Sequence, residues 1–169
     1  MDGAINRVRG GFGSLASHQH LRRLNSVWIE SPIYFLTICV AGRRRLLANH
    51  RALGILRAEF EAAPQRYGWM VGQFVVMPDH LHFFCASDQR PTSASLSGFI
   101  GGLKQWTAKG ILRAASLPPP LWQKQFFDHV LRSSESYESK WRYVSENPVR
   151  AGLVDAVDDW PYADRIAPL

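Results

Sequence analysis

The apolar residues of this chain alternate between the two-residue period of strands and the longer period of helices. Runs rich in β-branched and aromatic side chains predict strands at 33–40, 69–77, 80–86 and 121–131, the last with a turn. Helical spacing predicts helices over 53–63, 93–115 and 136–146. This order predicts an α+β fold with a ferredoxin-like (split βαβ) antiparallel sheet and one helix added at the end.

Proline and glycine residues predict where these elements end. Pro64 followed by Gly68 should close the first helix, and Pro148 should end the last, because the residue before a proline avoids the helical region. Gly101-Gly102 in the middle helix is expected to allow close packing on the sheet. The segment Trp160-Pro161-Tyr162 is expected to pack back on the fold.

The length and composition of the chain predict a single domain. Its 169 residues are 46% hydrophobic, enough for one core over residues 27–169, while residues 1–26 predict a flexible basic arm. No apolar run reaches the length of a membrane span, and the start lacks the apolar block of a secretory signal. We therefore expect a cytoplasmic protein, with Cys39 and Cys85 as buried free thiols.

Positive charge is concentrated in two parts of the chain, whose net charge is +6. Residues 1–57 hold nine Lys and Arg against two acids, and residues 90–127 hold five and no acid. The pattern fits either a solvated basic surface or a footprint for a polyanion. The candidates for contact with a nucleic-acid backbone are Arg43, Arg44, Arg45, Lys104, Lys109 and Arg150.

The pair His80 and His82 is the strongest chemical signal. Both lie in a predicted strand, so their side chains point to the same face, about 7 Å apart along the strand. Two such imidazoles can bind one divalent cation if a third ligand arrives from elsewhere. An isolated pair of this spacing is more often structural. His18 and His20 have the same spacing in a segment without strand pattern, and no metal is assigned to them.

A helix some 60 residues later offers that third ligand. Tyr143 and Asn147 are four residues apart and should share a helix face. The amide oxygen of Asn147 suits Mg²⁺ or Mn²⁺. Asn147 also reads simply as a helix-terminal residue, and both interpretations can hold. Tyr137 is interpreted as packing, because Trp141 four residues later cannot bind a metal, and Trp106 is expected in the core.

A phenol beside a metal suggests one particular chemistry. The metal would polarise a phosphoryl oxygen, and the phenol could attack phosphorus in line. With a pKa of about 10, a phenolate leaves more easily than an alkoxide, so another hydroxyl can resolve the phosphotyrosine. Tyr143 is therefore the candidate nucleophile of a reversible strand transfer.

These residues carry a family resemblance. The segments MPDHLHFF (77–84) and YVSENPVRAGLV (143–154) resemble the HUH-type single-tyrosine transposases, and more closely the REP-associated tyrosine transposases. The segments GRRRLL (42–47) and residues 122–132 are similar as well. The resemblance covers residues 30–163.

The resemblance implies roles for particular residues. His80 and His82 match the metal-binding histidines, Tyr143 the nucleophile, and Asn147 the third metal ligand, where related transposases often carry Gln. It implies the HUH nuclease version of the ferredoxin-like sheet, with the tyrosine on the added helix. It also implies cleavage of single-stranded hairpin DNA, of the repetitive extragenic palindrome kind, through a 5′-phosphotyrosine and a free 3′-hydroxyl, without a small-molecule cofactor. More distant relatives are dimers with shared sites, whereas the closer family can act as monomers, and we expect a monomer rather than a homodimer.

Two other functions remain open from the residues alone. A nucleic-acid-binding module could keep the same fold without chemistry. A metal-dependent phosphodiesterase that uses water would need the histidines but not Tyr143. Replacing Tyr143 with Phe separates the second alternative from the transferase.

Overall fold

The computed structural model describes residues 32–131 and 134–169. The arm predicted over 1–26, with His18 and His20, lies outside these residues. The strands are β1 (Ile33–Cys39), β2 (Trp69–Val76), β3 (His80–Ser87), β4 (Phe127–Leu131) and β5 (Ala163–Arg165). The helices are α1 (His50–Tyr67), α2 (Leu96–Ala115), α3 (Ser134–Ser145) and α4 (Asn147–Arg150), with 3₁₀ turns at Ala41–Arg43 and Val157–Asp159.

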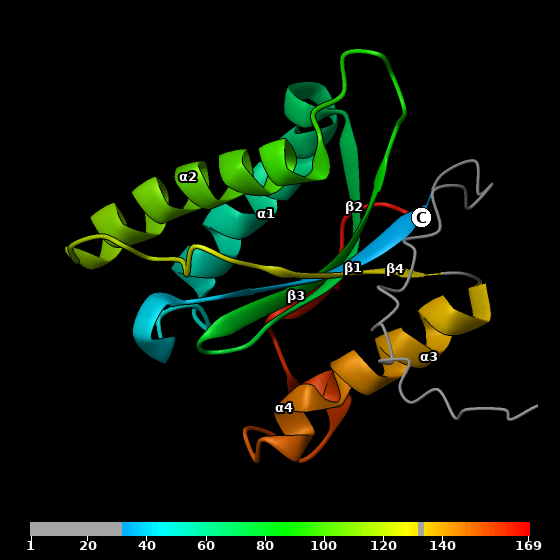
Figure 1. The fold of residues 1–169 in the computed structure, drawn as a ribbon. Coiled ribbons are helices and arrows are strands. Elements are labelled where there is room, and N and C mark those ends of the chain that lie inside the picture. The colour runs from blue at the N-terminus through cyan, green and yellow to red at the C-terminus, as the bar shows by residue number, and fades with distance from the viewer. Residues whose placement is uncertain (1–31, 132–133) are drawn as a thin grey trace, which may run out of the picture.

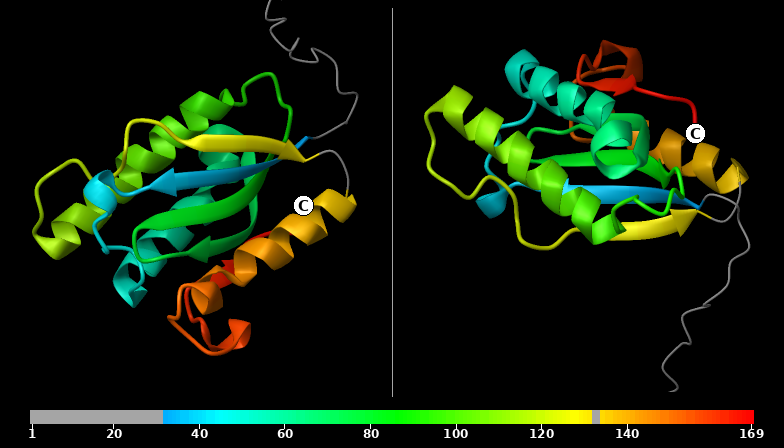
Figure 2. Two further views of the ribbon diagram at one scale, coloured as in Figure 1. Left: turned by 60° about the horizontal axis from the view of Figure 1, so that its bottom comes forward. Right: turned by 90° about the horizontal axis from the view of Figure 1, so that it is seen from above.

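The described strands form one antiparallel sheet in the order β4-β1-β3-β2-β5. Without β5, this is the strand order of the split βαβ arrangement that the sequence predicts, and the α+β fold class is confirmed. β5, which was not predicted, pairs with the outer edge of β2. Helices α1 and α2 cover one face of the sheet, and α3 lies on the other (Figures 1 and 2).

The two faces of β1 and β3 bury different clusters. Leu36 and Phe83 point to the α1 and α2 side, where they join the larger apolar core. Phe35 and Phe84 point to the α3 side, into a smaller cluster with Val144 of α3. Because neighbouring residues of a strand alternate between faces, His80 and His82 share the α3 side with Phe84.

Two predicted element ends differ in the structure. Pro64 does not end α1, because it lies inside the last turn; Gly68 ends it in the left-handed conformation, at φ 73°. The fourth strand begins at Phe127 rather than at residue 121. In the segment before this strand, the ammonium of Lys104 on α2 donates hydrogen bonds to the carbonyls of residues 123–125. Trp122 is joined to Val40 by an isolated β-bridge. A backbone carbonyl that accepts a hydrogen bond from a side chain is less available to pair with a neighbouring strand.

The break between α3 and α4 also differs from the prediction. α3 stops at Ser145, and a new short helix starts at Asn147, with Pro148 in its first turn. A proline is favourable there because it has no amide hydrogen to leave unpaired. Pro148 therefore separates two helices, and Asn147 begins the second instead of ending the first.

Two packing expectations for α2 are wrong. A Cβ atom at Gly102 would meet the ring of Tyr67 on α1, and one at Gly101 would meet open space, so the pair does not pack on the sheet. Trp106 is 48% exposed rather than in the core. Apolar periodicity finds the buried stripe of a helix but not the neighbour that each flanking residue meets.

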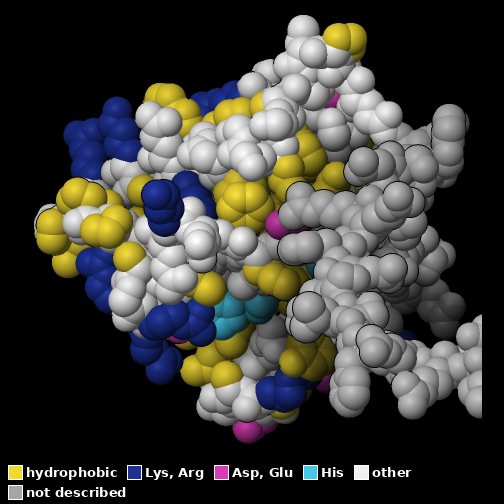
Figure 3. Space-filling model, in the orientation of Figure 1, with side chains coloured by type: hydrophobic (Ala, Val, Ile, Leu, Met, Phe, Trp, Pro, Cys, Tyr) yellow, Lys and Arg dark blue, Asp and Glu magenta, His cyan; other side chains and the backbone are white. Residues whose placement is uncertain are grey.

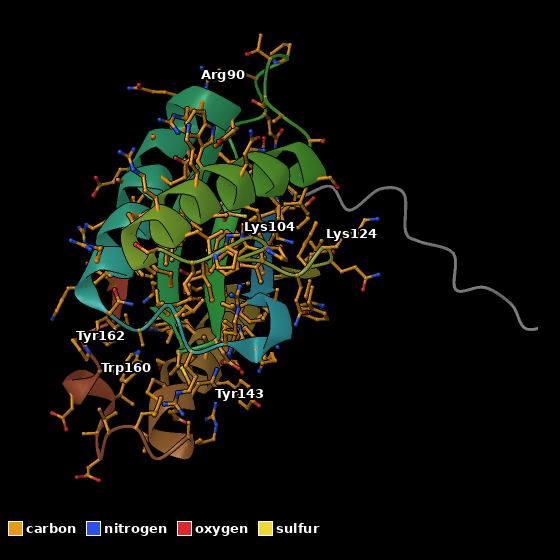
Figure 4. The ribbon with its side chains drawn as sticks, turned by 90° about the vertical axis from the view of Figure 1, so that its left-hand side faces the viewer. Arg90, Lys104, Lys124, Tyr143, Trp160 and Tyr162 are labelled. Atoms are coloured by element: carbon orange, nitrogen blue, oxygen red, sulfur yellow. The ribbon has the colours of Figure 1, made fainter. Side chains whose placement is uncertain are left out.

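The C-terminal segment packs back on the fold as expected. The indole nitrogen of Trp160 donates to the carbonyl of Val76 at 3.2 Å, and the amide of Val76 donates to the carbonyl of Tyr162 at 2.8 Å. The two rings lie side by side (Figure 4), with centroids 5.1 Å apart. Cys39 and Cys85 are free thiols, although only Cys85 is fully buried. None of the described helices has the length and apolarity that a membrane crossing requires.

Candidate active site

One cavity of about 410 Å³ brings together His80, His82, Tyr143 and Asn147. The histidines come from β3, Tyr143 from α3 and Asn147 from α4. The four candidates are thus gathered on one side of the sheet by two segments about 60 residues apart in the sequence. Histidine side chains reach the surface on this side of the molecule, with basic side chains close by (Figure 3).

The central position of β3 holds both imidazoles in place. In the antiparallel register, His82 faces Thr37 of β1 and His80 faces Cys39. The ring centroids of His80 and His82 are 4.7 Å apart, and the ring of His82 stacks on Phe35 with centroids 5.5 Å apart. A paired central strand with buried neighbours leaves these side chains little freedom.

Each histidine uses its Nδ1 atom within the protein. Nδ1 of His80 donates to the carboxylate of Asp79 at 2.6 Å, since an ionised carboxylate can only accept. Nδ1 of His82 and the hydroxyl of Thr37 are 2.8 Å apart and joined by a hydrogen bond. No hydrogen bond to a described residue engages either Nε2 atom. Such partners on Nδ1 orient a histidine whose Nε2 binds a metal.

The surroundings of His82 keep it neutral. Burial, followed by the charges of His80, Arg43 and Lys140, lowers the pKa of His82 to about 3. Neutral imidazole is the form that binds a metal ion. His82 is therefore ready as a ligand at neutral pH without first losing a proton.

Tyr143 and Asn147 are joined through Arg150. The Arg150 guanidinium lies over the Tyr143 ring, 4.2 Å from its centroid, and donates to the Tyr143 carbonyl and to Oδ1 of Asn147. It also forms an ion pair with Glu146 at 2.9 Å. Tyr143 is 61% exposed. Its ring is thus accessible to a large substrate, while its backbone carbonyl is held by Arg150 at the end of α4.

The donor set of this cavity fits a divalent cation. Within residues 32–131 and 134–169, no three His, Cys, Asp or Glu side chains are grouped to hold a metal, so the histidine pair needs a donor of another kind. The Asn147 amide lines the same cavity, and its oxygen has a second lone pair beyond the one that Arg150 engages. Two imidazoles and an amide oxygen are groups that can bind one divalent cation.

Three further cavity residues were not identified from the sequence. Lys140 lies three residues before Tyr143 on α3, with its ammonium 5.3 Å from the centroid of Phe35. The same helical spacing that linked Tyr143 to Asn147 could have found Lys140. Phe35 and Met77 complete an apolar wall. Their place depends on which strands are neighbours, a fact that no local pattern contains.

The predicted DNA-contact residues fall in different places. Arg44 donates to the carbonyls of Ala41 and Pro120, and Lys104 binds the segment before β4, so the chain itself occupies both cations. Lys109 lies 5.5 Å from the centroid of the exposed Trp106 ring on α2. Burial lowers the pKa of Lys104 below its usual value. Only Arg43, Arg45 and Arg150 lie close to the cavity residues.

Comparisons with known proteins match this chain to transposases. The model of the family described as "Transposase IS200 like" matches residues 30–147. A REP-associated tyrosine transposase of Escherichia coli (strain K12) is 26% identical over 136 residues, which span 80% of this chain and 78% of that protein. A Haemophilus influenzae relative with a provisional description of the same kind is 22% identical, over 79% of this chain and 80% of its own length.

A solved structure shares the fold. A REP-associated tyrosine transposase bound to a REP hairpin superimposes with a TM-score of 0.65 at 24% identity, over 82% of this chain and 79% of that one. The HUH version of the ferredoxin-like sheet, expected from the sequence resemblance, is confirmed by this match. The resemblance to REP-associated tyrosine transposases is confirmed by the same relatives.

Proposed function

Because this chain belongs to the IS200-like transposase family, we propose that it cleaves and joins single-stranded DNA with Tyr143 as the nucleophile. One observation carries the proposal above the others. A phenol, two imidazoles whose Nε2 atoms have no hydrogen bond to a described residue, and an amide oxygen line a single cavity. A module that only binds DNA has no need for this combination of groups.

His80, His82 and Asn147 would hold Mg²⁺ or Mn²⁺ in this cavity. A bound cation of this type supplies charge stabilisation to a phosphoryl oxygen and orients the scissile phosphate. Asp79 and Thr37 fix the two imidazole rings through Nδ1, at 2.6 and 2.8 Å, so that both Nε2 atoms remain available to the cation.

Tyr143 would attack the scissile phosphorus through its phenol oxygen. The new bond joins this oxygen to phosphorus, and the bond from phosphorus to the 3′-oxygen breaks, so a free 3′-hydroxyl leaves and the 5′ end stays on Tyr143. The phenol proton passes to solvent or to the leaving oxygen. Attack by the 3′-hydroxyl of a second strand reverses these steps and joins the DNA. The phosphoester bond to Tyr143 replaces the cleaved phosphodiester bond, so joining needs no outside source of energy. The Lys140 ammonium, which lines the cavity, would balance the phosphate charge.

The substrate we propose is a DNA hairpin flanked by single strand. The structural relative is bound to a REP hairpin, and this chain carries a net charge of +6 that favours a polyanion. We propose that a monomer is sufficient, because all four candidate residues of one cavity come from the same chain. A protein that acts on such a DNA substrate would be located in the cytoplasm, together with the DNA of the cell.

A covalent-transfer experiment tests this function. Purified protein is incubated with end-labelled hairpin DNA that has single-stranded flanks, with Mn²⁺ or with EDTA, and resolved on a denaturing protein gel. We expect label on the protein with Mn²⁺ only, and none with Tyr143→Phe. Tyr137→Phe is the matched control on the same helix, because the Tyr137 ring packs on Phe84 with centroids 4.6 Å apart.

The alternatives give different results in the same experiment. Cleavage that survives in Tyr143→Phe without retained label would identify a water-using phosphodiesterase. Hairpin binding with neither cleavage nor label would identify a non-catalytic binding module. Either outcome contradicts the transferase proposal.

A further inference from the structure

A second cavity adjoins the first at His80. It has a volume of about 290 Å³ and shares three lining residues with the first cavity, namely Met77, His80 and Ala151. Its remaining lining residues are Arg43, Arg45, Pro78, Asp79 and Leu153, whereas Tyr143, Lys140 and Arg150 line only the first. His80 therefore lines both cavities, whereas the other two candidate metal ligands, His82 and Asn147, line only the first.

The three consecutive arginines beside this cavity differ in what they contact. Arg43 pairs with Asp79 at 2.8 Å and donates to Cys39 at 2.9 Å, and Arg44 donates to backbone carbonyls. Arg45 is exposed, lines the cavity, and has no hydrogen bond or ion pair to any described residue. Arg45 is thus the arginine of this run whose charge is available to a ligand.

The single acid of the cavity does not cancel that charge. The two oxygens of Asp79 are engaged, one by Nδ1 of His80 and the other by Nε of Arg43. Met77, Pro78 and Leu153 add an apolar surface to the lining of this cavity. A cavity with one free guanidinium and an apolar wall suits a nucleotide, which has an anionic phosphate and a flat, largely apolar base.

We propose that this second cavity binds the nucleotide next to the scissile phosphate of single-stranded DNA, with Arg45 on its phosphodiester. The inference rests on the proposed function. A strand whose scissile phosphate lies at His80 must continue beyond it, and the second cavity adjoins His80 without being lined by Tyr143, which leaves it available to the neighbouring nucleotide. Arg43 acts as a positioning residue here, since it holds Asp79 and through it the His80 ring.

A substrate-length experiment tests the site. The probe is a fluorescently labelled DNA hairpin with thymidine extensions of increasing length on the 5′ or the 3′ side. Binding is measured by anisotropy with Mn²⁺ in the Tyr143→Phe background, so that no strand is cut. For the protein with Arg45, affinity should rise as one of the two extensions lengthens. Arg45→Ala should lower the affinity for the extended probes by about tenfold or more, the value of one charge-assisted hydrogen bond, and should lower the salt slope by about one.

Arg113→Ala is the matched control. Arg113 is also an exposed arginine, and its side chain has no hydrogen bond or ion pair to any described residue; it does not line this cavity. The Arg113→Ala substitution should lower the affinity for all probes equally and by a small amount. Arg45→Lys should restore part of the gain in affinity that depends on the extension. A shared melting temperature of the variants would show that the fold is intact.

The outcomes separate the two proposals. Equal losses in Arg45→Ala and Arg113→Ala on every probe, with label still transferred to Tyr143 in the covalent-transfer experiment on protein that retains this tyrosine, would overturn the second site and leave the transferase intact. Absence of any hairpin binding and of any label on Tyr143 would overturn both. A loss confined to one extension, seen in Arg45→Ala alone, would establish the site and identify the side of the hairpin that enters it.

Discussion

The two faces of the sheet serve different purposes. The α1 and α2 face buries the larger apolar cluster, in which Leu36, Phe60 and Phe83 are wholly inaccessible to solvent. The α3 face has a smaller cluster around Phe35 and Phe84, and beside it the strands present histidines to an open cavity. Stability is thus concentrated on one side, which leaves the other free to carry polar groups that a tightly packed core would exclude.

The contrast is sharpest within single strands. On β1, Leu36 points into the larger core and the next residue, Thr37, holds Nδ1 of His82. On β3, His82 faces the cavity and Phe83 the core. Neighbouring substitutions should therefore separate loss of stability from loss of activity, and the following variants are arranged from the largest expected effect to the smallest.

Replacing either histidine should abolish cleavage. His80→Ala or His82→Ala removes one of two imidazole ligands, and we expect a fall in single-turnover cleavage of about a thousandfold or more, because a bound cation is worth several kcal/mol to phosphate chemistry. EDTA added to the unmodified protein should reproduce this loss. Retained hairpin binding would show that the fold survives. Unchanged cleavage in both variants would remove the histidines from the mechanism.

Replacing Leu36 should lower the stability of the fold and leave cleavage unchanged. Leu36→Ala leaves a cavity in the larger core, and the free energy of unfolding should fall by about 3 kcal/mol in urea denaturation. At a temperature where the variant is folded, its single-turnover cleavage should match that of the unmodified protein. A large loss of cleavage in a fully folded Leu36→Ala would show that the two faces are not independent.

Replacing Thr37, one residue further along, should weaken the metal site only. Thr37→Val keeps the shape of the side chain but removes the hydroxyl at Nδ1 of His82. Loss of such a partner typically costs 10- to 100-fold in metal affinity, so we expect about a tenfold higher Mn²⁺ concentration at half-maximal cleavage. Saturating Mn²⁺ should restore the rate, while no recovery would indicate that Thr37 acts in another way.

Arg150 should affect the rate of the chemical step rather than DNA affinity. Its guanidinium holds the Tyr143 carbonyl and Oδ1 of Asn147, so Arg150→Ala should slow cleavage at saturating hairpin by about tenfold through misplacement of these groups. Arg142→Ala on α3 is the control, because Arg142 does not line this cavity. A fall in hairpin affinity with an unchanged saturated rate would instead support the phosphate contact predicted from the sequence.

Local patterns predicted most of the fold and the centre of the site. Strand alternation places His80 and His82 on one face, and that inference needs no tertiary information. Tyr143 and Asn147 do line one cavity, although a helix break at Pro148 rather than one continuous helix brings them there. The four-residue spacing was therefore informative even though Asn147 begins a second helix instead of sharing one with Tyr143.

The parts that the sequence did not predict depend on contacts between distant segments. The partnership of Thr37 with His82 follows from the register of β1 against β3, which no local pattern specifies. Gly102 meets Tyr67, and Trp106 is exposed, because of the way in which α2 lies against α1. The early start expected for β4 was wrong because Lys104 holds the carbonyls before Phe127.

Peptide mapping of the covalent intermediate tests the central claim most directly. Trypsin cuts after Lys140, Arg142 and Arg150, so Tyr143 falls in the peptide 143–150 and Tyr137 in a different one. After reaction with hairpin DNA and Mn²⁺, followed by nuclease trimming, mass spectrometry should find a nucleotide phosphate on peptide 143–150, at Tyr143. A nucleotide on the peptide that contains Tyr137, or a cleaved strand with no modified peptide, would contradict the account.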